Sequence, residues 1–148
     1  MEHDEIYRTI MDGSPEATVW AGADGMIRYW NQGAEEMFGF TRDEALGQSL
    51  DLIIPENLRA RHWEGYDRVM VKGEPSRYGR REMLKVPALR KDGTRMSVEF
   101  TLQMVQHPEH GLTAVAVLRD ASEAFNELRE LRKQLAVFQA AAKDAPAT

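Results

Sequence analysis

Alternating apolar and polar residues mark one long strand in the second half of the chain. Apolar side chains occupy every second position there, at Met96, Val98, Phe100, Leu102 and Met104. The positions between them are polar, so one face of this strand should be buried and the other hydrated. Further β-prone runs bounded by turn residues lie at 17–21, 26–30, 80–89 and 112–119. The pattern predicts five strands, with the first two joined by the Asp24-Gly25 turn.

Helical periodicity lies between the first two predicted strands and the last three. Asn31 and Thr41 are each placed as the N-cap of a short helix. A longer helix is expected from Pro55, and its apolar stripe includes His62 and Tyr66. A histidine on such a stripe should point toward a core or a pocket. The order of elements predicts an α+β fold, a five-stranded antiparallel sheet with flanking helices that enclose a cavity.

The C-terminal part carries a heptad pattern. Its apolar members recur at steps of four and three: Ala124, Leu128, Leu131, Leu135, Phe138 and Ala142. Charged residues surround this seam, which predicts a signalling or dimerisation helix over 123–142 and therefore a homodimer. The alternative is an amphipathic helix that folds back on its own domain. An N-terminal helical cap over 1–14, a main domain over 15–122 and a flexible tail over 143–148 complete the expected organisation.

Composition narrows the classes of function. The 148 residues carry 19 Lys+Arg against 24 Asp+Glu, and a net charge of −5 provides no basic footprint for nucleic acid. No apolar run approaches the roughly 18 residues that a membrane span requires, and the acidic N-terminus lacks a signal region, so we expect a cytoplasmic protein. The absence of cysteine excludes disulfides, thiolate metal sites and a cysteine nucleophile. No hydrolase, phosphate-loop or dinucleotide motif occurs, so we expect no enzymatic activity.

Several segments resemble PAS domains, in the order and spacing typical of that family. They are the run from Asp24 to Gly47, Ile54-Pro55, Arg90-Lys-Asp-Gly93 and the closing Leu118-Arg-Asp-Ala-Ser122. The resemblance covers about residues 5–122. It implies a sensory and signal-relay domain with a pocket under its central helix. It also implies that Asp120 and Ser122 lie at the junction with a signalling helix and relay a signal to an unidentified downstream partner.

The central helix resembles that of haem-binding oxygen-sensor PAS domains. The matching residues are Pro55-Glu56, Arg59-Ala-Arg-His62 and Tyr66. This resemblance implies a b-type haem whose iron takes His62 as axial ligand, with Tyr66 nearby and Arg68 at a propionate. A gas or the redox state of the iron would then be the signal.

Two methionines are candidates for a sixth haem ligand, because a thioether stabilises ferrous iron. These are Met83 and Met104, although methionines on strands more commonly fill the core. Ser76 and Glu82 depart from the residues that surround haem and oxygen in the sensors. The alternative function is a haem-free PAS dimerisation or interaction module, whose pocket is empty or holds a small metabolite.

Overall fold

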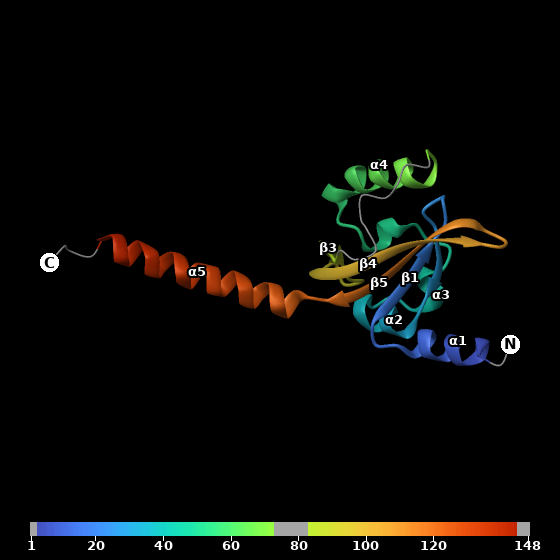
Figure 1. Cartoon of the computed structure of the whole chain (residues 1–148), viewed down its shortest axis with the longest axis horizontal. Helices are drawn as coiled ribbons and strands as arrows, with labels where there is room; N and C mark the ends of the chain where they lie inside the picture. Colours follow the sequence, from blue (N-terminus) through green and yellow to red (C-terminus); the bar gives the residue numbers. More distant parts are fainter. Residues whose placement is uncertain (1–2, 73–82, 145–148) are drawn as a thin grey trace.

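The computed structural model describes residues 3–72 and 83–144 (Figure 1). The elements in chain order are α1 (Asp4–Gly13), β1 (Ala17–Ala21), β2 (Ile27–Trp30), α2 (Gln32–Phe38), α3 (Arg42–Ala45), the 3-10 helices η1 (Leu50–Ile53) and η2 (Glu56–Leu58), α4 (Arg59–Met70), β3 (Leu84–Leu89), β4 (Arg95–His107), β5 (Gly111–Asp120) and α5 (Ser122–Asp144). The helix expected from Pro55 thus begins with a 3-10 turn. Ser76, Glu82 and the start of the expected third strand lie outside the described residues.

The five strands form one antiparallel sheet in the order β2-β1-β5-β4-β3. The first strand pairs with the last, and Val19 lies opposite Ala116. The helices between β2 and β3 connect the two halves of the sheet (Figure 1). The predicted α+β fold, a five-stranded antiparallel sheet with flanking helices, is therefore confirmed.

The hydrophobic core lies between the sheet and the short helices that follow β2. Trp30 and Phe38 are fully buried there, with ring centroids 5.4 Å apart. Trp30 Nε1 donates to the carbonyl oxygen of Phe40 at 3.0 Å, so burial of the indole leaves no unpaired donor. Trp30 is therefore a core residue.

Burial decreases along β4. Met96 and Val98 are 3% and 1% exposed, whereas Phe100, Leu102 and Met104 on the same face are only partly buried. β4 and β5 continue as a hairpin beyond the helices that cover the core (Figure 1). The alternation therefore predicts the correct face, while the cover over each residue decides how deeply it is buried.

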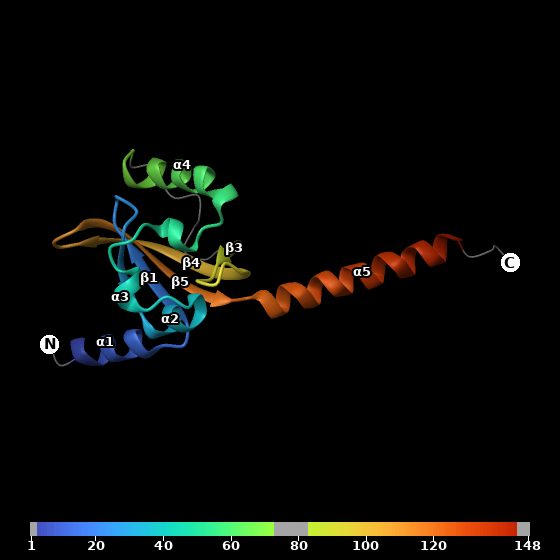
Figure 2. The same ribbon diagram turned by 180° about the vertical axis from the view of Figure 1, so that it is seen from behind.

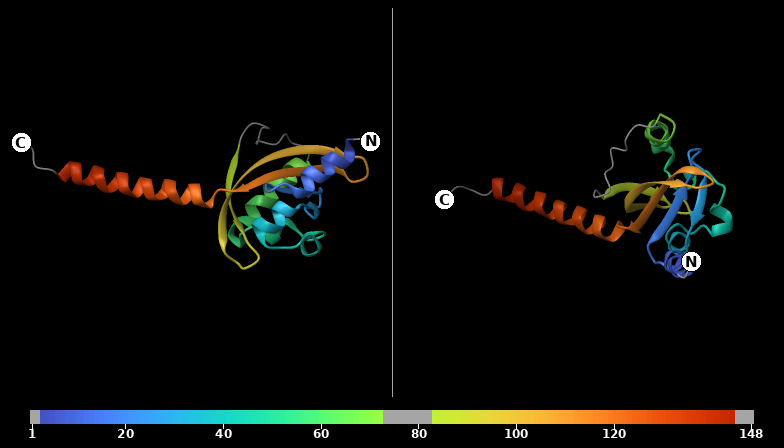
Figure 3. Two further views of the ribbon diagram at one scale, coloured as in Figure 1. Left: turned by 90° about the horizontal axis from the view of Figure 1, so that it is seen from below. Right: turned by 45° about the vertical axis from the view of Figure 1, so that its right-hand side comes forward.

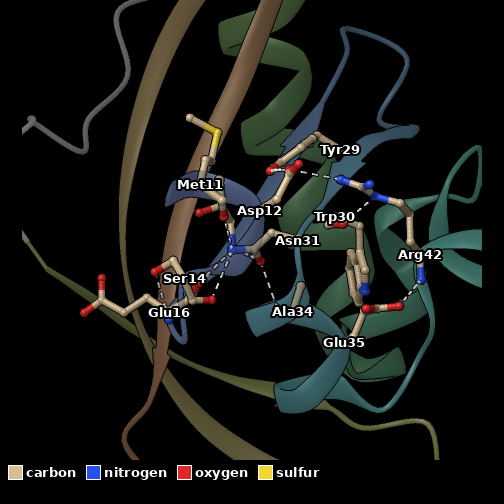
Figure 4. A network of polar contacts seen from close by, with 11 residues as sticks. Met11, Asp12, Ser14, Glu16, Tyr29, Trp30, Asn31, Ala34, Glu35 and Arg42 are labelled. Atoms are coloured by element: carbon tan, nitrogen blue, oxygen red, sulfur yellow. Dashed lines mark hydrogen bonds and ion pairs between the residues drawn. The ribbon is translucent and has the colours of Figure 1, made fainter. Parts of the chain in front are cut away.

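Asn31 links three segments near the N-terminus (Figure 4). Its Oδ1 accepts from the N–H of Ala34 at 3.0 Å, which is the predicted N-cap, and from the N–H of Thr18 at 2.8 Å. Its Nδ2 donates to the carbonyl oxygens of Met11 at 2.8 Å and Glu16 at 2.9 Å. The end of α1, the start of β1 and the start of α2 are thus joined through one buried amide.

α5 leaves the domain as a straight helix and does not return to it (Figures 2 and 3). Every residue from Glu123 to Asp144 is exposed. The alternative in which this helix folds back on its own domain is therefore not what the structure contains.

Candidate functional site

α4 carries the candidate ligand His62, and two of its aromatic side chains anchor it to the rest of the domain. Trp63 Nε1 donates to Oδ1 of Asp51 in η1 at 2.7 Å. The hydroxyl of Tyr66 donates to the carbonyl oxygen of Gly22 at the end of β1. Trp63 and Tyr66 lie three positions apart on one helical face. That face therefore rests on η1 and on the turn between β1 and β2.

Trp63 also covers the β1–β2 turn at Gly25. The backbone of Gly25 has a φ of +75°, in the left-handed region that favours glycine. A Cβ at this position would lie 2.3 Å from the Trp63 ring, so the ring packs directly on the backbone. The Asp24-Gly25 pair, which the sequence predicts as a hairpin turn, therefore also forms part of the surface on which α4 packs.

His62 packs in a cluster with two aromatic rings, and one of its ring nitrogens is buried. Its ring centroid is 4.7 Å from that of Trp63 and 5.5 Å from that of Tyr66. Its Nδ1 is buried and has no hydrogen-bond partner among the described residues. Burial lowers the pKa of His62, against an opposing effect of the Asp51 carboxylate. The imidazole is therefore neutral at neutral pH, the form in which histidine ligates a metal.

A cavity of about 520 Å³ lies beside α4, on the side of the β1–β2 turn. Its lining consists of Ala23, Asp24, Ala60, Trp63, Glu64, Tyr66 and Asp67. His62 is not part of this lining, although both of its ring neighbours are. Arg68 pairs with Glu64 at 2.6 Å, at the exposed side of the same helix.

The two candidate methionines lie in different parts of the sheet. Met104 is partly buried in β4 and lies opposite Ala114, which lies opposite Ala21 in turn. Ala21 is followed by Gly22, whose carbonyl oxygen accepts the hydrogen bond from Tyr66 of α4. Met83 precedes the edge strand β3 and is 43% exposed. Met104 is therefore at the α4 end of the sheet, and Met83 is at its rim.

The sheet meets α5 at Asp120 and Ser122. Asp120 Oδ1 accepts from the N–H of Ser122 at 2.9 Å, and Ser122 Oγ accepts from the N–H of Ser97 at 3.0 Å. Burial alone would raise the pKa of Asp120, but hydrogen bonds from Ser122 and the nearby Arg90 outweigh it and lower the pKa. The Arg90 guanidinium lies 3.2 Å from the second carboxylate oxygen. Sequence reasoning missed Arg90, whose only signal was its place in the Arg90-Lys-Asp-Gly93 turn.

A second polar cluster attaches α1 to the first hairpin (Figure 4). The hydroxyl of Tyr29 donates to Asp12, and Arg42 lies 3.2 Å from the same carboxylate oxygen. Burial raises the pKa of Tyr29, and the neighbouring Asp12 carboxylate raises it further. The hydroxyl therefore keeps the proton that it donates to Asp12. The sequence contains no signal for this cluster, because Asp12 lies 17 and 30 positions from its two partners.

Two kinds of feature are lacking in the described part of the chain. None of the helices in residues 3–72 and 83–144 is both long and apolar enough to cross a membrane. In the same part of the chain, no group of three or more His, Asp or Glu side chains is placed to hold a metal ion.

Comparison with known proteins identifies relatives. The family model for the PAS fold matches residues 5–121. An uncharacterized protein of Azorhizobium caulinodans is 32% identical over 128 residues, which are 85% of this chain and 17% of that protein. The oxygen sensor protein DosP of Escherichia coli K12 is 28% identical over 131 residues, 88% of this chain and 16% of DosP. The sensor protein FixL of Bradyrhizobium diazoefficiens is 28% identical over 130 residues, 86% of this chain and 25% of FixL. The chain thus spans a quarter or less of these relatives.

Solved structures share the fold. The PAS domain of a Colwellia psychrerythraea protein matches 80% of this chain and 97% of its own with a TM-score of 0.63, at 21% identity. The PAS domain of an HTR-like protein from Haloarcula marismortui matches 80% and 92% with a TM-score of 0.56, at 25% identity. Since the family model also spans most of the sequence, the chain belongs to the PAS family of sensory domains.

Proposed function

We propose that this PAS domain is a cytoplasmic gas or redox sensor that binds b-type haem, with His62 as axial ligand to the iron. The observation that supports this most is the buried Nδ1 of His62, which has no hydrogen-bond partner within residues 3–72 and 83–144. A buried polar atom without a partner is costly, and a ligand that bonds to Nδ1 would remove that cost. Burial also keeps the ring neutral, so a nitrogen lone pair is available to iron.

Other residues of the domain offer groups that such a cofactor uses. Arg68 supplies a guanidinium for a propionate, because its exposed pair with Glu64 costs little to give up in water. Met104 offers a thioether at the α4 end of the sheet, and Met83 is the second candidate for that role. Tyr66 packs beside the imidazole and keeps α4 attached to Gly22. When bound, haem would supply a coordination position for a diatomic gas and a change of oxidation state.

The proposed relay runs from the sheet into α5 through Asp120 and Ser122. Ser122 connects β4 to the start of α5, and Arg90 ties Asp120 to the β3–β4 turn. A ligand changes such a junction only if it binds two arrangements of it unequally. The output would be a homodimer acting on a downstream partner, with no catalysis and no nucleic-acid or membrane partner.

An absorbance spectrum tests the haem proposal. Purified protein, or protein given haemin, should show a Soret band that His62→Ala abolishes or strongly weakens. His110→Ala is the matched control, because His110 lies in the exposed β4–β5 turn and its loss should leave the band unchanged. Wild-type protein that stays colourless and takes up no added haemin would refute the proposal.

A haem-free module with a small-metabolite pocket is the second candidate. The cavity of about 520 Å³ favours it, because its walls combine the apolar rings of Trp63 and Tyr66 with three carboxylates. Native mass spectrometry of colourless protein should then reveal a retained organic molecule. A mass equal to that of the bare chain would count against this candidate.

A further inference from the structure

No described residue outside α5 covers the apolar seam of this helix. Its four large members are Leu128, Leu131, Leu135 and Phe138, exposed by 44%, 61%, 55% and 72%. Isolated helices of this size are marginal in water, and most helical stability in proteins comes from packing of an apolar face. α5 points away from its own domain, so the described part of the domain does not supply that packing (Figures 1 and 2).

The charged residues beside the seam favour a second copy of this chain in one orientation. Leu128 and Leu135 occupy the a positions of the heptads, and Leu131 and Phe138 occupy the d positions. Glu127 then falls at a g position and Arg132 at the following e position. In a parallel pair, a g residue faces the e residue five positions later on the other helix. Glu127 would therefore face Arg132 of the second copy, and this pair would form twice.

An antiparallel pair lacks this complementarity. Antiparallel helices place e opposite e and g opposite g. With the leucines paired in layers, Arg132 would lie opposite Arg132 of the second copy, and Glu127 would lie opposite the uncharged Ala141. The attractive pairs are lost and a repulsive one is gained.

We propose that α5 pairs with α5 of a second copy in a parallel, in-register coiled coil whose direction is selected by Glu127 and Arg132. This rests on the proposed dimeric sensory function and adds its geometry. A parallel pair places both Ser122 residues at the same end of the coiled coil. The two domains would then act on one shared helix entrance, at their Asp120–Ser122 junctions.

Cysteine cross-linking tests the direction, and the lack of native cysteine makes the readout clean. Ala124→Cys puts a thiol at a d position near the start of α5. In the parallel dimer the two thiols face each other within disulfide distance, so mild oxidation of the full chain should convert most of it to a covalent dimer. In an antiparallel dimer the introduced thiol would lie near Ala142 of the second copy, about 27 Å from the other thiol.

Two matched Ala→Cys variants complete the test. Ala140→Cys places a thiol on the outer f position and should remain largely uncross-linked, which measures random collision. A mixture of Ala124→Cys and Ala142→Cys should give homodimeric disulfides only. Mixed disulfides without homodimers would overturn the parallel orientation, and cross-linking no faster than that of Ala140→Cys would overturn the pairing itself.

Charge reversal tests the selection of direction. Glu127→Arg and Arg132→Glu should each weaken the dimer about tenfold in sedimentation equilibrium, because two attractive pairs become repulsive. The double exchange should restore the wild-type dissociation constant. Glu130→Arg is the control, since it makes the same change of charge at an outer c position. Equal weakening by Glu127→Arg and Glu130→Arg would overturn the role of the pair.

The tests of the coiled coil do not depend on whether the protein binds haem. Cross-linking and sedimentation do not require a cofactor, and the absorbance test does not require α5. A haem-free parallel dimer would therefore refute only the cofactor, and a haem-binding monomer would refute only the coiled coil.

Discussion

Replacing Asn31 with alanine should destabilise the domain severely, because one buried amide joins α1, β1 and α2. The side chain is 1% exposed and has four hydrogen bonds of 3.0 Å or less. Two of its partners, the N–H groups of Thr18 and Ala34, are themselves buried. Alanine would leave both without an acceptor.

The magnitude follows from those two donors. A buried group left without a partner costs about 1–3 kcal/mol. Two such groups give about 2–6 kcal/mol, and the two carbonyl oxygens are only partly buried, so water can satisfy them at a smaller cost. We expect a loss of about 3–5 kcal/mol, a large share of the roughly 5–15 kcal/mol by which domains are stable.

Urea unfolding followed by tryptophan fluorescence measures this loss. Gln32→Ala is the matched control, because Gln32 is the next residue and its exposed side chain donates a hydrogen bond to Glu36, also in α2. Its free energy of unfolding should change by less than about 0.5 kcal/mol. If the Asn31→Ala loss were no larger than that of the control, the described network would be wrong.

Asn31→Asp separates the accepted bonds from the donated ones. It retains the acceptor for Thr18 and Ala34 but sets a carboxylate against the carbonyl oxygens of Met11 and Glu16. The folded protein should therefore favour the protonated acid, which raises its pKa. The variant should be most stable at low pH and lose stability as the pH rises. A flat profile relative to wild type would contradict this arrangement.

Two further predictions concern α4 and the junction with α5. Burial lowers the pKa of His62 from its ordinary value of 6.5. Below that pH the unfolded chain binds a proton that folded His62 resists. The haem-free protein should therefore lose stability as the pH falls below 6.5. Urea unfolding across pH should show that slope, and a His62→Gln variant with the same slope would contradict it. Ser122→Ala removes the acceptor of the Ser97 N–H, so it should cost about 1 kcal/mol and speed exchange of that amide, whereas Ser122→Thr should preserve both. Unchanged exchange in Ser122→Ala would exclude this link.

Local features of the fold were predictable because their physics acts over a few residues. Thr41 caps α3 as expected and forms a capping box with Glu44, and Asn31 caps α2. The Asp24-Gly25 turn and the strand alternation depend on neighbours in the chain. The packing of Trp63 on Gly25 was less predictable, because it brings together a helix and a turn that are far apart in sequence.

The candidate site likewise combines features set by neighbouring residues with contacts between segments far apart in the chain. His62 is recognisable from its place on an apolar stripe, but its unpaired Nδ1 follows from how α4 docks. Asp120 and Ser122 belong to one short motif. Their partners Arg90 and Ser97 are brought to them by the pairing of β3, β4 and β5.

The amino-acid sequence by itself determined the order of strands and helices, the inward faces and the heptad seam, because these are periodic features of neighbouring residues. Tertiary structure decided how deeply Met104 is buried, which groups surround His62, and that α5 leaves the domain with its seam uncovered. These properties depend on contacts between segments far apart in the chain, and no local pattern contains them.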